Sequence, residues 1–274
     1  RNIKLTIEYA GTNYAGWQCQ KSRISAKGGS AYGGKNQKSK IKTIQGTIEI
    51  ALYRILHKRV KAIGSGRTDS GVHARGQIAN FKTDSGIAPE KLQKALNAVL
   101  PDDISVIRTE ETEADFHSRF SAKSKVYRYT ILNRPSRPAI LRGAVHFCSY
   151  PLDLKLMRKE ARVLLGRHDF KSFCASGSNT KETIRTIKRI TIRKLPYNLS
   201  PITHNLSEFP LILIDIEADG FLYNMVRNIV GTLIEIGRGK LAEGSTKKIL
   251  LARNRKFGGP TLPAKGLCLV EVKY

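Results

Sequence analysis

Residues 64–75 read Gly64-Ser65-Gly66-Arg67-Thr68-Asp69-Ser70-Gly71-Val72-His73-Ala74-Arg75, and the rest of the chain is arranged around them. Three glycines fall within eight residues, so the backbone can bend sharply here and a ligand can approach it closely. Apolar residues flank the stretch, and residues 77–81 have the composition of a strand. Polar loops held between apolar segments commonly present side chains to a ligand, which makes this loop the first candidate for a functional site.

Asp69 carries the only carboxylate of this loop, with Arg67, His73 and Arg75 as its neighbours along the chain. Nearby positive charge favours the ionised form of a carboxylate, so we expect Asp69 to be charged. Composition alone leaves three interpretations: a solvated surface turn, a phosphate-binding loop, or a catalytic carboxylate in a basic pocket. The phosphate-binding loop is the weakest, because no Gly-Lys-Ser/Thr follows as the pattern G-x-x-x-x-G-K-[ST] requires.

Residues 66–74 resemble the signature of the TruA family of tRNA pseudouridine synthases, G-R-T-D-x-G-V-H-A. Further stretches resemble that family in the same order and cover nearly the whole chain. They are Tyr9-Ala10-Gly11-Thr12 with Gly16-Trp17-Gln18, Ile44-Gln45-Gly46, Phe116-His117-Ser118-Arg119-Phe120, Tyr127-Arg128-Tyr129, Gly220-Phe221-Leu222, Met225-Val226-Arg227-Asn228 and Ala264-Lys265-Gly266-Leu267. One departure is Ala10, which stands where the family usually has aspartate.

Hydrophobic periodicity predicts an α+β protein with a large mixed or antiparallel sheet. Strands are expected at residues 3–9, 77–81, 104–108, 123–132, 183–195, 211–218 and 267–272, and helices at 44–56, 89–100, 152–165, 221–236 and 245–253. Thr43 is expected to cap the first of these helices and Ser245 the last. The resemblance implies the pseudouridine synthase fold, with two pseudo-symmetric α+β halves that share the sheet and an active-site cleft between them. We accordingly expect an N-terminal half at 1–115, which carries loop 64–75, and a C-terminal half at 116–274.

Two stretches interrupt this pattern. Residues 20–43 are rich in Gly, Ser and Lys, which favours a flexible loop, and residues 196–210 are polar. We interpret both as loop insertions. The sequence leaves open whether either contacts RNA.

The chain is strongly basic, with 48 Lys and Arg against 22 Asp and Glu and a net charge of +26. Such a charge favours a polyanionic partner, with nucleic acid as the leading candidate. An anionic membrane surface is the alternative, but the sequence shows no basic amphipathic helix of the interfacial kind. No run approaches the roughly 20 apolar residues of a membrane span, and residues 1–5 lead straight into a strand pattern rather than a signal peptide.

Metal and disulfide chemistry is not indicated. The four cysteines, Cys19, Cys148, Cys174 and Cys268, are far apart, and no C-x-x-C occurs. This spacing predicts neither a zinc site nor a disulfide framework, and it favours a reducing cytoplasm. The six histidines form no H-x-x-x-H pair. No dinucleotide fingerprint or Walker motif is present either.

Residues 221–236 are apolar over most of a helical surface, so we expect this helix to be largely buried. Arg227 lies in its polar stripe, and a lone buried charge would cost several kcal/mol without a partner. The residues leave open whether Arg227 reaches solvent, or pairs with Asp215, Glu217 or Asp69. The resemblance favours Asp69, because the family's arginine at this position faces the catalytic aspartate.

The resemblance implies isomerisation of uridine to pseudouridine in the anticodon stem-loop of tRNA, at positions 38–40, without a cofactor or metal. Asp69 is expected to be the catalytic carboxylate, and Arg227 to keep it charged and oriented. The expected substrate contacts are Tyr127, Arg67 and Leu267, and the expected RNA contacts are Arg75, Arg119, Arg128 and Arg185. The family also implies a homodimer. The sequence does not decide whether Asp69 attacks C1′ or the uracil ring, or removes the ribose C2′ proton.

Two other functions compete with this one. A non-catalytic RNA-binding or chaperone protein of the same fold would explain the charge, but it would have no reason to keep Asp69, Tyr127 and Arg227 together. A basic structural protein of the ribosome would also explain the charge, but not a mostly buried helix that carries an arginine. We therefore favour the enzyme.

Overall fold

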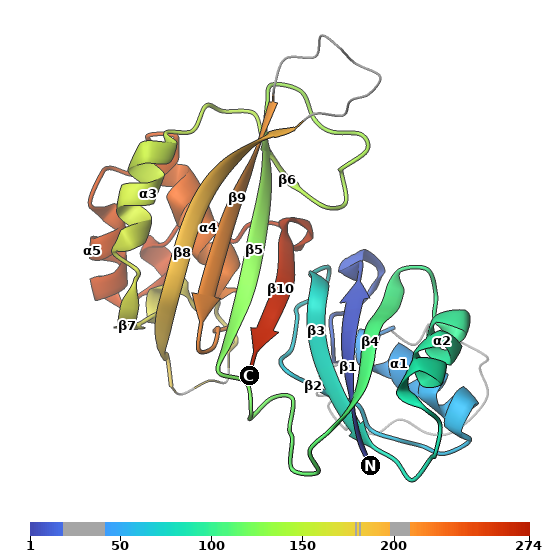
Figure 1. The fold of residues 1–274 in the computed structure, drawn as a ribbon. Coiled ribbons are helices and arrows are strands. Elements are labelled where there is room, and N and C mark those ends of the chain that lie inside the picture. Colours follow the sequence, from blue (N-terminus) through green and yellow to red (C-terminus); the bar gives the residue numbers. More distant parts are fainter. Residues whose placement is uncertain (19–41, 179, 181, 198–208) are drawn as a thin grey trace, which may run out of the picture.

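The computed structural model describes residues 1–18, 42–178, 180, 182–197 and 209–274. These residues form a sheet of ten strands with five α-helices, which confirms the α+β class (Figure 1). The strands are β1 Asn2–Tyr9, β2 Ile63–Gly64, β3 His73–Lys82, β4 Ile104–Thr112, β5 Ser124–Asn133, β6 His146–Cys148, β7 Gly166–Asp169, β8 Ile184–Tyr197, β9 Phe209–Ala218 and β10 Leu267–Lys273. The helices are α1 Ile44–Leu56, α2 Pro89–Val99, α3 Leu154–Arg162, α4 Met225–Gly237 and α5 Ser245–Ala252, and 3-10 turns lie at Gly11–Asn13, Lys171–Phe173, Arg255–Phe257 and Ala264–Gly266.

The last strand of the chain lies in the middle of the sheet. The order is β4-β1-β3-β10-β5-β9-β8-β7, with β2 beside β3 and β6 beside β5. β10 pairs in parallel with β3, where Cys268 lies opposite His73, and antiparallel with β5, where Leu267 lies opposite Tyr129. The sheet therefore continues across the boundary that we expect near residue 115, and the division into two halves stays an interpretation.

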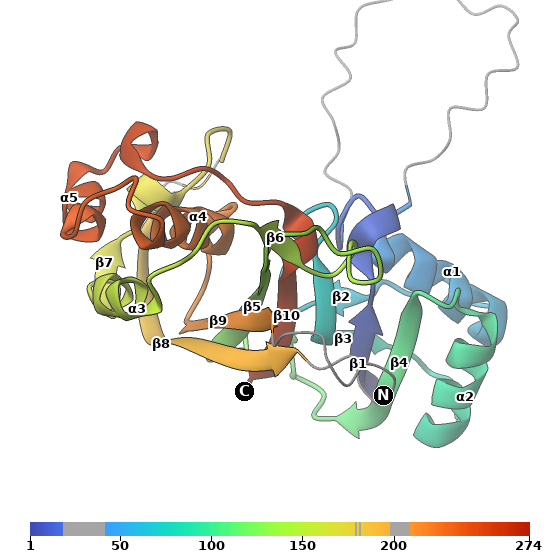
Figure 2. The ribbon, with the colours of Figure 1, turned by 90° about the horizontal axis from the view of Figure 1, so that it is seen from above.

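The strand register places one row of buried side chains across the sheet. Tyr9 lies opposite Ala74, Ala74 opposite Leu269, Leu269 opposite Tyr127, and Tyr127 opposite Ile216. Residues that are directly paired share one face of a sheet, so these five side chains point the same way. All five are buried, because this is the face that the helices cover. Figure 2 shows α3, α4 and α5 beside β8, β9 and β5, and α1 and α2 at the other end of the sheet.

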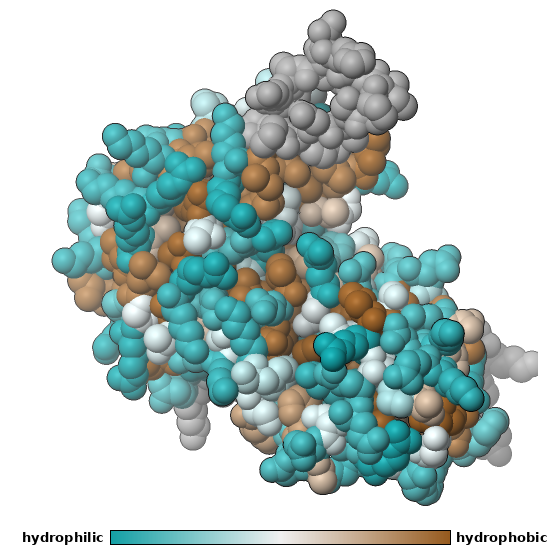
Figure 3. Space-filling model, viewed as in Figure 1, coloured by the Kyte–Doolittle hydropathy of each residue, from teal (hydrophilic) through white to brown (hydrophobic). Residues whose placement is uncertain are grey.

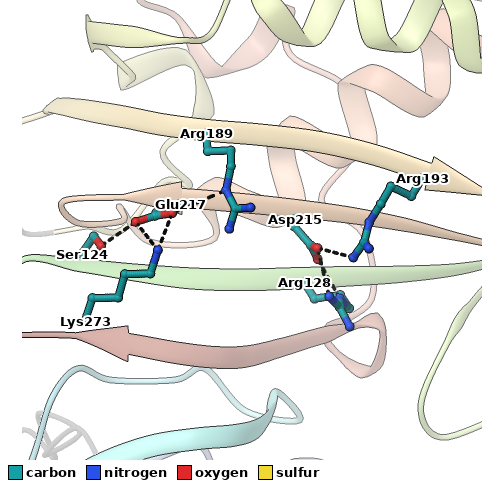
Figure 4. A network of polar contacts seen from close by, with 7 residues as sticks. All are labelled: Ser124, Arg128, Arg189, Arg193, Asp215, Glu217 and Lys273. Carbon is teal, nitrogen blue, oxygen red and sulfur yellow. Dashed lines mark hydrogen bonds and ion pairs between the residues drawn. The ribbon is translucent and has the colours of Figure 1, made fainter.

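The opposite face of β5, β8, β9 and β10 carries a network of ion pairs (Figure 4). Arg128 donates to both carboxylate oxygens of Asp215 at 2.7 and 3.0 Å, and Arg193 donates to Asp215 at 2.9 Å. Glu217 accepts from Lys273 at 2.9 Å and lies 3.5 Å from Arg189. This face thus satisfies its own buried carboxylates without any residue of loop 64–75.

The surface seen from this side is mostly hydrophilic, with scattered hydrophobic patches (Figure 3). Its outline is indented between the part that holds β6 and the part that holds β1 and β4. The indentation lies between strands of the two expected halves. Within the residues placed in the structure, no helix reaches the length and hydrophobicity that crossing a bilayer requires.

Most of the expected helices and strands are confirmed. The corrections concern the residues at which they begin and end. Thr43 caps α1 as expected, with its hydroxyl accepting the Gly46 N–H. Ser245 begins α5, but the residue that precedes the helix is Gly244, in a left-handed conformation that makes no side-chain cap. Capping by Ser245 was therefore a wrong prediction, because glycine adopts that conformation at little cost.

The two predicted insertions need narrower limits. β8 and β9 continue their pairing to Tyr197 opposite Phe209, so residues 196–210 are not a loop throughout. The prediction rested on the polar composition of residues 196–210, which does not show that the two strands continue into both ends of the stretch. Residues 198–208 lie outside the described residues. The same holds for residues 20–41 of the first insertion, whereas Lys42 accepts a hydrogen bond from the Ala15 N–H and Thr43 caps α1.

Candidate active site

Loop 64–75 is anchored at its start by a buried glutamine of β3. Gln77 accepts the Ser65 hydroxyl at 2.6 Å and donates to the Gly66 carbonyl at 3.0 Å. The Ser65 N–H also donates to the Ile78 carbonyl at 2.7 Å, which extends the pairing of β2 with β3. Gln77 is fully buried, so both the oxygen and the nitrogen of its side-chain amide need a partner, and the loop provides one for each.

Thr68, just before Asp69, is held by hydrogen bonds from the end of β1 and from the turn that follows it. Tyr9 and Thr68 share a hydrogen bond of 2.8 Å between their hydroxyls, and the Trp17 N–H donates to the Thr68 carbonyl at 3.1 Å. Gly16 adopts a φ of +95°, and a Cβ there would lie 2.3 Å from the Thr68 carbonyl oxygen. Only glycine both adopts this φ readily and leaves room for the carbonyl oxygen, so Gly16 can pack directly against Thr68.

Asp69 itself has a fixed backbone and an unpartnered side chain. Its carbonyl accepts the Val72 N–H at 3.1 Å in a tight turn. Among the residues that the structure describes, none donates a hydrogen bond or ion pair to its carboxylate. Burial raises the pKa of Asp69, and the charge of Arg227 acts in the opposite direction. The carboxylate is therefore positioned by the chain and left available for a ligand.

The expected charged neighbours of Asp69 point elsewhere. Arg67 is exposed and donates to the Gln18 side chain at 2.9 Å. His73 accepts the Gly11 N–H on Nδ1 at 3.2 Å, and its Nε2 lies 3.0 Å from the Gly143 carbonyl. This arrangement needs a neutral ring with its proton on Nε2, and burial lowers the pKa of His73 accordingly. Proximity in sequence was therefore a wrong guide to the charge that acts on Asp69.

Arg227 lies in the first turn of α4, which begins after Asn224 in a left-handed conformation, φ 58°. Its guanidinium donates to the Asn224 side-chain oxygen at 2.6 Å and to the Leu262 carbonyl. The alternative partners, Asp215 and Glu217, are paired with other cations. In the described part of the chain Arg227 makes no ion pair with Asp69 either, so its effect on Asp69 acts through space.

Tyr127 borders the same region from β5. Its ring meets Phe221 edge to face, with 5.0 Å between ring centroids, and 7% of the residue is exposed. Burial raises the pKa of Tyr127 far above its usual value, and the charge of Asp69 adds to this effect, so the phenol stays neutral. Its hydroxyl finds no hydrogen-bond partner within the described residues, which leaves it free for a ligand. Leu267 lies at the start of β10, 5% exposed.

The four arginines that we expect to contact RNA do not lie together. Arg119 is exposed, and its guanidinium lies 5.6 Å from the ring of Phe120, which is 76% exposed. Arg185 is partly buried and donates to the Ile184 carbonyl at 2.5 Å. Arg128 is committed to Asp215 on the sheet face opposite Tyr127.

Arg75 belongs to that opposite face as well. It follows Ala74, which shares a face with Tyr127, so the alternation of the strand turns Arg75 away. Burial raises the pKa of the Cys268 thiol to about 11, and the charges of Arg75 and Arg128 both act against that rise. The two arginines therefore lie near each other and across the sheet from Asp69.

Comparison with known proteins settles the family. A family model described as tRNA pseudouridine synthase matches residues 28–121 and 161–274. The chain belongs to the tRNA pseudouridine synthase family. Proteins named tRNA pseudouridine synthase A from Acetivibrio thermocellus and Thermoanaerobacter pseudethanolicus are each 43% identical to it, over 274 residues that cover 100% of both chains. The protein of that name from Caldicellulosiruptor bescii is 44% identical over 274 residues, again 100% of both chains.

Membership in the tRNA pseudouridine synthase family confirms the resemblance seen in residues 66–74 and makes the chain an isomerase of that class. Within the described ranges, no group of three or more His, Cys, Asp or Glu side chains is arranged to hold a metal ion. Cys148 and Cys174 are buried free thiols, Cys268 is a partly buried one, and Cys19 lies outside the described residues.

Sequence reasoning missed two residues that pack against loop 64–75. Gln77, in β3, holds the loop through its amide, and its signal is a glutamine that alternates with Ala79 and Phe81 along the strand. Lys125, in β5, stands two residues before Tyr127 and so shares its face. A lysine at a position where the strand period calls for a buried residue is a signal that the sequence contained.

Proposed function

We propose that the chain isomerises uridine to pseudouridine in the anticodon stem-loop of tRNA, at positions 38–40, with Asp69 as the catalytic carboxylate. The observation that carries this proposal is the carboxylate of Asp69, which has no partner among the described residues. It belongs to a hydrogen-bonded loop and lies within the electrostatic reach of Arg227 and Tyr127. A protein that only binds RNA would not need a buried carboxylate, since a negative charge repels the phosphate backbone.

The reaction breaks the bond between uracil N1 and ribose C1′, turns the base, and joins C5 to C1′. The hydrogen on C5 leaves as a proton and N1 gains one, so nothing is oxidised or reduced and the stoichiometry needs no cofactor. Asp69 serves either as a nucleophile or as a base, and both roles need its ionised form. Because burial disfavours that form, the opposing charge of Arg227 supports catalysis.

The target base has to leave the helical stack before Asp69 can reach it, at a cost of a few kcal/mol. Tyr127 offers its ring to the flipped nucleotide, together with a hydroxyl that has no partner among the described residues, and stacking on an aromatic ring contributes about 1–3 kcal/mol. Leu267 lines the apolar side of this space. Arg67, exposed two residues before Asp69, is placed to contact the RNA backbone or the displaced base.

The remaining tRNA contacts are assigned to exposed or partly exposed basic groups. Arg119 is the best supported of the four expected arginines, because its charge is exposed on the chain that leads into β5. Arg185 is the next candidate. Arg75 and Arg128 lie on the opposite sheet face, so they reach RNA bound at Asp69 only if the tRNA extends around the molecule or a second protomer presents it. We propose a homodimer, and because tRNA is the substrate, a cytoplasmic enzyme.

The test is release of tritium from C5-labelled uridine in an unmodified tRNA transcript. Wild-type protein is expected to release label, and Asp69→Asn, which keeps the shape of the side chain, to lose roughly a thousandfold or more of the rate. Transcripts with cytidine at positions 38, 39 or 40 report which uridines react. Binding without release by the wild type would favour the non-catalytic alternative, and release by both proteins would discard Asp69 as the catalytic group.

A further inference from the structure

Lys125 occupies an inward position of β5. It lies opposite Ala218 of β9 and Val272 of β10, both buried. Because side chains alternate along a strand, Lys125 points to the same face as Tyr127, two residues later. The charge of Asp69 acts on Tyr127, so the carboxylate lies on this side of the sheet. The ammonium group is therefore on the substrate side of the sheet and not on the side that carries the ion-pair network.

The side chain of Lys125 lies directly against loop 64–75. A Cβ added at Gly66 would lie 3.3 Å from Lys125 Nζ and 3.4 Å from its Cε. The glycine thus lets a lysine pack against the loop backbone, three residues before Asp69. This contact fixes the position of a positive charge close to the loop that carries the carboxylate.

No acid among the described residues is paired with this charge. Within the described part of the chain, Lys125 makes no ion pair and no hydrogen bond. The charged group that acts on it is Arg119, which has the same sign, and both burial and Arg119 lower the pKa of Lys125. On the other sheet face, by contrast, Arg128 and Lys273 are each paired with a carboxylate. The chain neutralises its partly buried cations there and leaves Lys125 without a counter-ion.

An unpaired, partly buried ammonium group destabilises the free protein, since desolvation is not compensated. A bound anion would remove that cost. The substrate of a tRNA-modifying enzyme carries a phosphate at each nucleotide, and Arg119 beside Lys125 makes the position doubly positive. Phosphate is therefore the anion that fits both the charge and the substrate.

We propose that Lys125 binds a backbone phosphate of the tRNA strand that carries the target uridine, within a nucleotide or two of it. The proposal rests on the function proposed above for its substrate, but not on the catalytic role of Asp69. Lys125 is a substrate-positioning residue: it holds the strand against Gly66 so that the flipped nucleotide enters beside Tyr127.

The first experiment measures binding of an unmodified tRNA transcript at several salt concentrations. Lys125→Met removes the charge and keeps the length of the side chain. Its affinity is expected to fall about fivefold near physiological salt, and the slope of log Kd against log salt to fall by about 0.7 to 0.9, the value of one released counterion. Lys123→Met is the matched control, since Lys123 is exposed on the same strand approach and is expected to change neither quantity. An unchanged slope for Lys125→Met would overturn the proposal.

The second experiment locates the phosphate. Anticodon stem-loops are made with a single uncharged methylphosphonate at each linkage from two nucleotides before to two after the target uridine. Wild-type protein is expected to lose affinity when one of these linkages is uncharged. Lys125→Met is expected to bind equally well with and without the charge at that linkage, and to respond like the wild type at the others. Equal losses for both proteins at every linkage would show that Lys125 contacts none of these phosphates.

Two further measurements separate phosphate binding by Lys125 from an effect on folding and from the catalytic role of Asp69. Lys125→Met is expected to melt at or above the wild-type temperature, because an unpaired buried charge has been replaced by an apolar group; if it unfolds, Lys125→Gln takes its place in both experiments. Asp69→Asn is expected to keep the wild-type salt slope. If the Asp69 variant stays active while the linkage result for Lys125 holds, the catalytic assignment fails and the phosphate site stands.

Discussion

The carboxylate of Asp69 experiences two opposing effects, and their balance sets the pH range in which the enzyme works. Burial raises its pKa, while Arg227 lowers it without touching it. Arg227 is itself fixed by Asn224 and Leu262, so its charge is preorganised at a set distance rather than mobile. A fixed charge that favours the ionised form costs no reorganisation when substrate binds.

Removing the charge of Arg227 is expected to raise the pKa of Asp69. Activity needs the ionised form, so the acidic limb of kcat/KM against pH moves to higher pH in Arg227→Met, and the rate at neutral pH falls at least about tenfold. Arg227→Lys is the control, since it keeps the charge and loses only the paired donors. Its acidic limb should stay near that of the wild type. A limb that does not move in Arg227→Met would show that this charge does not act on the catalytic carboxylate.

His73 ties loop 64–75 to the connection between β5 and β6 through Gly143, and to Gly11 of the first turn. Its folded pKa is lowered by burial, while the unfolded chain titrates near 6.5. The unfolded state therefore binds more protons below that pH, and folding stability falls as the pH decreases from about 7. His73→Gln preserves an acceptor and a donor without titrating, so its melting temperature should vary less than that of the wild type between pH 7 and pH 5. Identical pH profiles for the two proteins would exclude His73 as the titrating group.

A buried carboxylate joins α3 to the start of α5. Glu160 of α3 accepts the N–H groups of Gly244 and Thr246 at 2.7 and 3.0 Å, and so caps the start of α5 from another helix. Burial raises the pKa of Glu160, but these hydrogen bonds and the charge of Lys159 outweigh it, and the net shift is downward. The stabilisation is therefore present at neutral pH and is lost as the pH falls through the folded pKa.

Glu160→Gln leaves one N–H of the α5 start without its charged acceptor. We expect a loss of about 1.5–3 kcal/mol in the free energy of unfolding at pH 7, the range for hydrogen bonds to a charged group. The difference from the wild type should shrink below about pH 4, where the wild-type carboxyl is protonated as well. Urea unfolding at both pH values measures this. Glu243→Gln, at an exposed carboxylate nearby, is the control and should leave unfolding close to that of the wild type.

Helices and strands could be predicted from the sequence where local signals and packing favour the same structure. Thr43 and the apolar spacing after it gave α1, and the alternation of residues 3–9 gave β1, because both patterns are dictated by one buried face. Arg128 shows what such local patterns leave out. Strand periodicity puts it on the face opposite Tyr127, but only the register shows that Asp215 lies across from it. Pairing between distant strands carries no signal in a single sequence.

At the scale of the whole molecule, the position of β10 was the least predictable feature. A strand from the end of the chain lies between β3 and β5. It pairs Cys268 with His73 and brings Ala264, in the turn before it, close to Gly71 of loop 64–75. Nothing in residues 267–273 distinguishes a central strand from an edge strand, and the placement depends on contacts with the rest of the sheet. The signature loop was recognisable because its glycines and charges are local. The neighbours that tune it come from β5, α4 and β10.

The distribution of charge over the molecule leads to a prediction that distinguishes arginines paired with a carboxylate from arginines that can contact tRNA. The net charge of +26 predicts tRNA affinity that falls steeply with salt, roughly a thousandfold between 50 and 200 mM if six phosphates are contacted. Arg119 is exposed and unpaired by any acid in the described residues, so Arg119→Met should lower the slope of log Kd against log salt by about 0.7 to 0.9. Arg128 is neutralised by Asp215, which keeps Arg193 as a partner when Arg128 is replaced. Arg128→Met should therefore leave the slope unchanged, and a lowered slope would show that tRNA reaches the face of the sheet opposite Asp69.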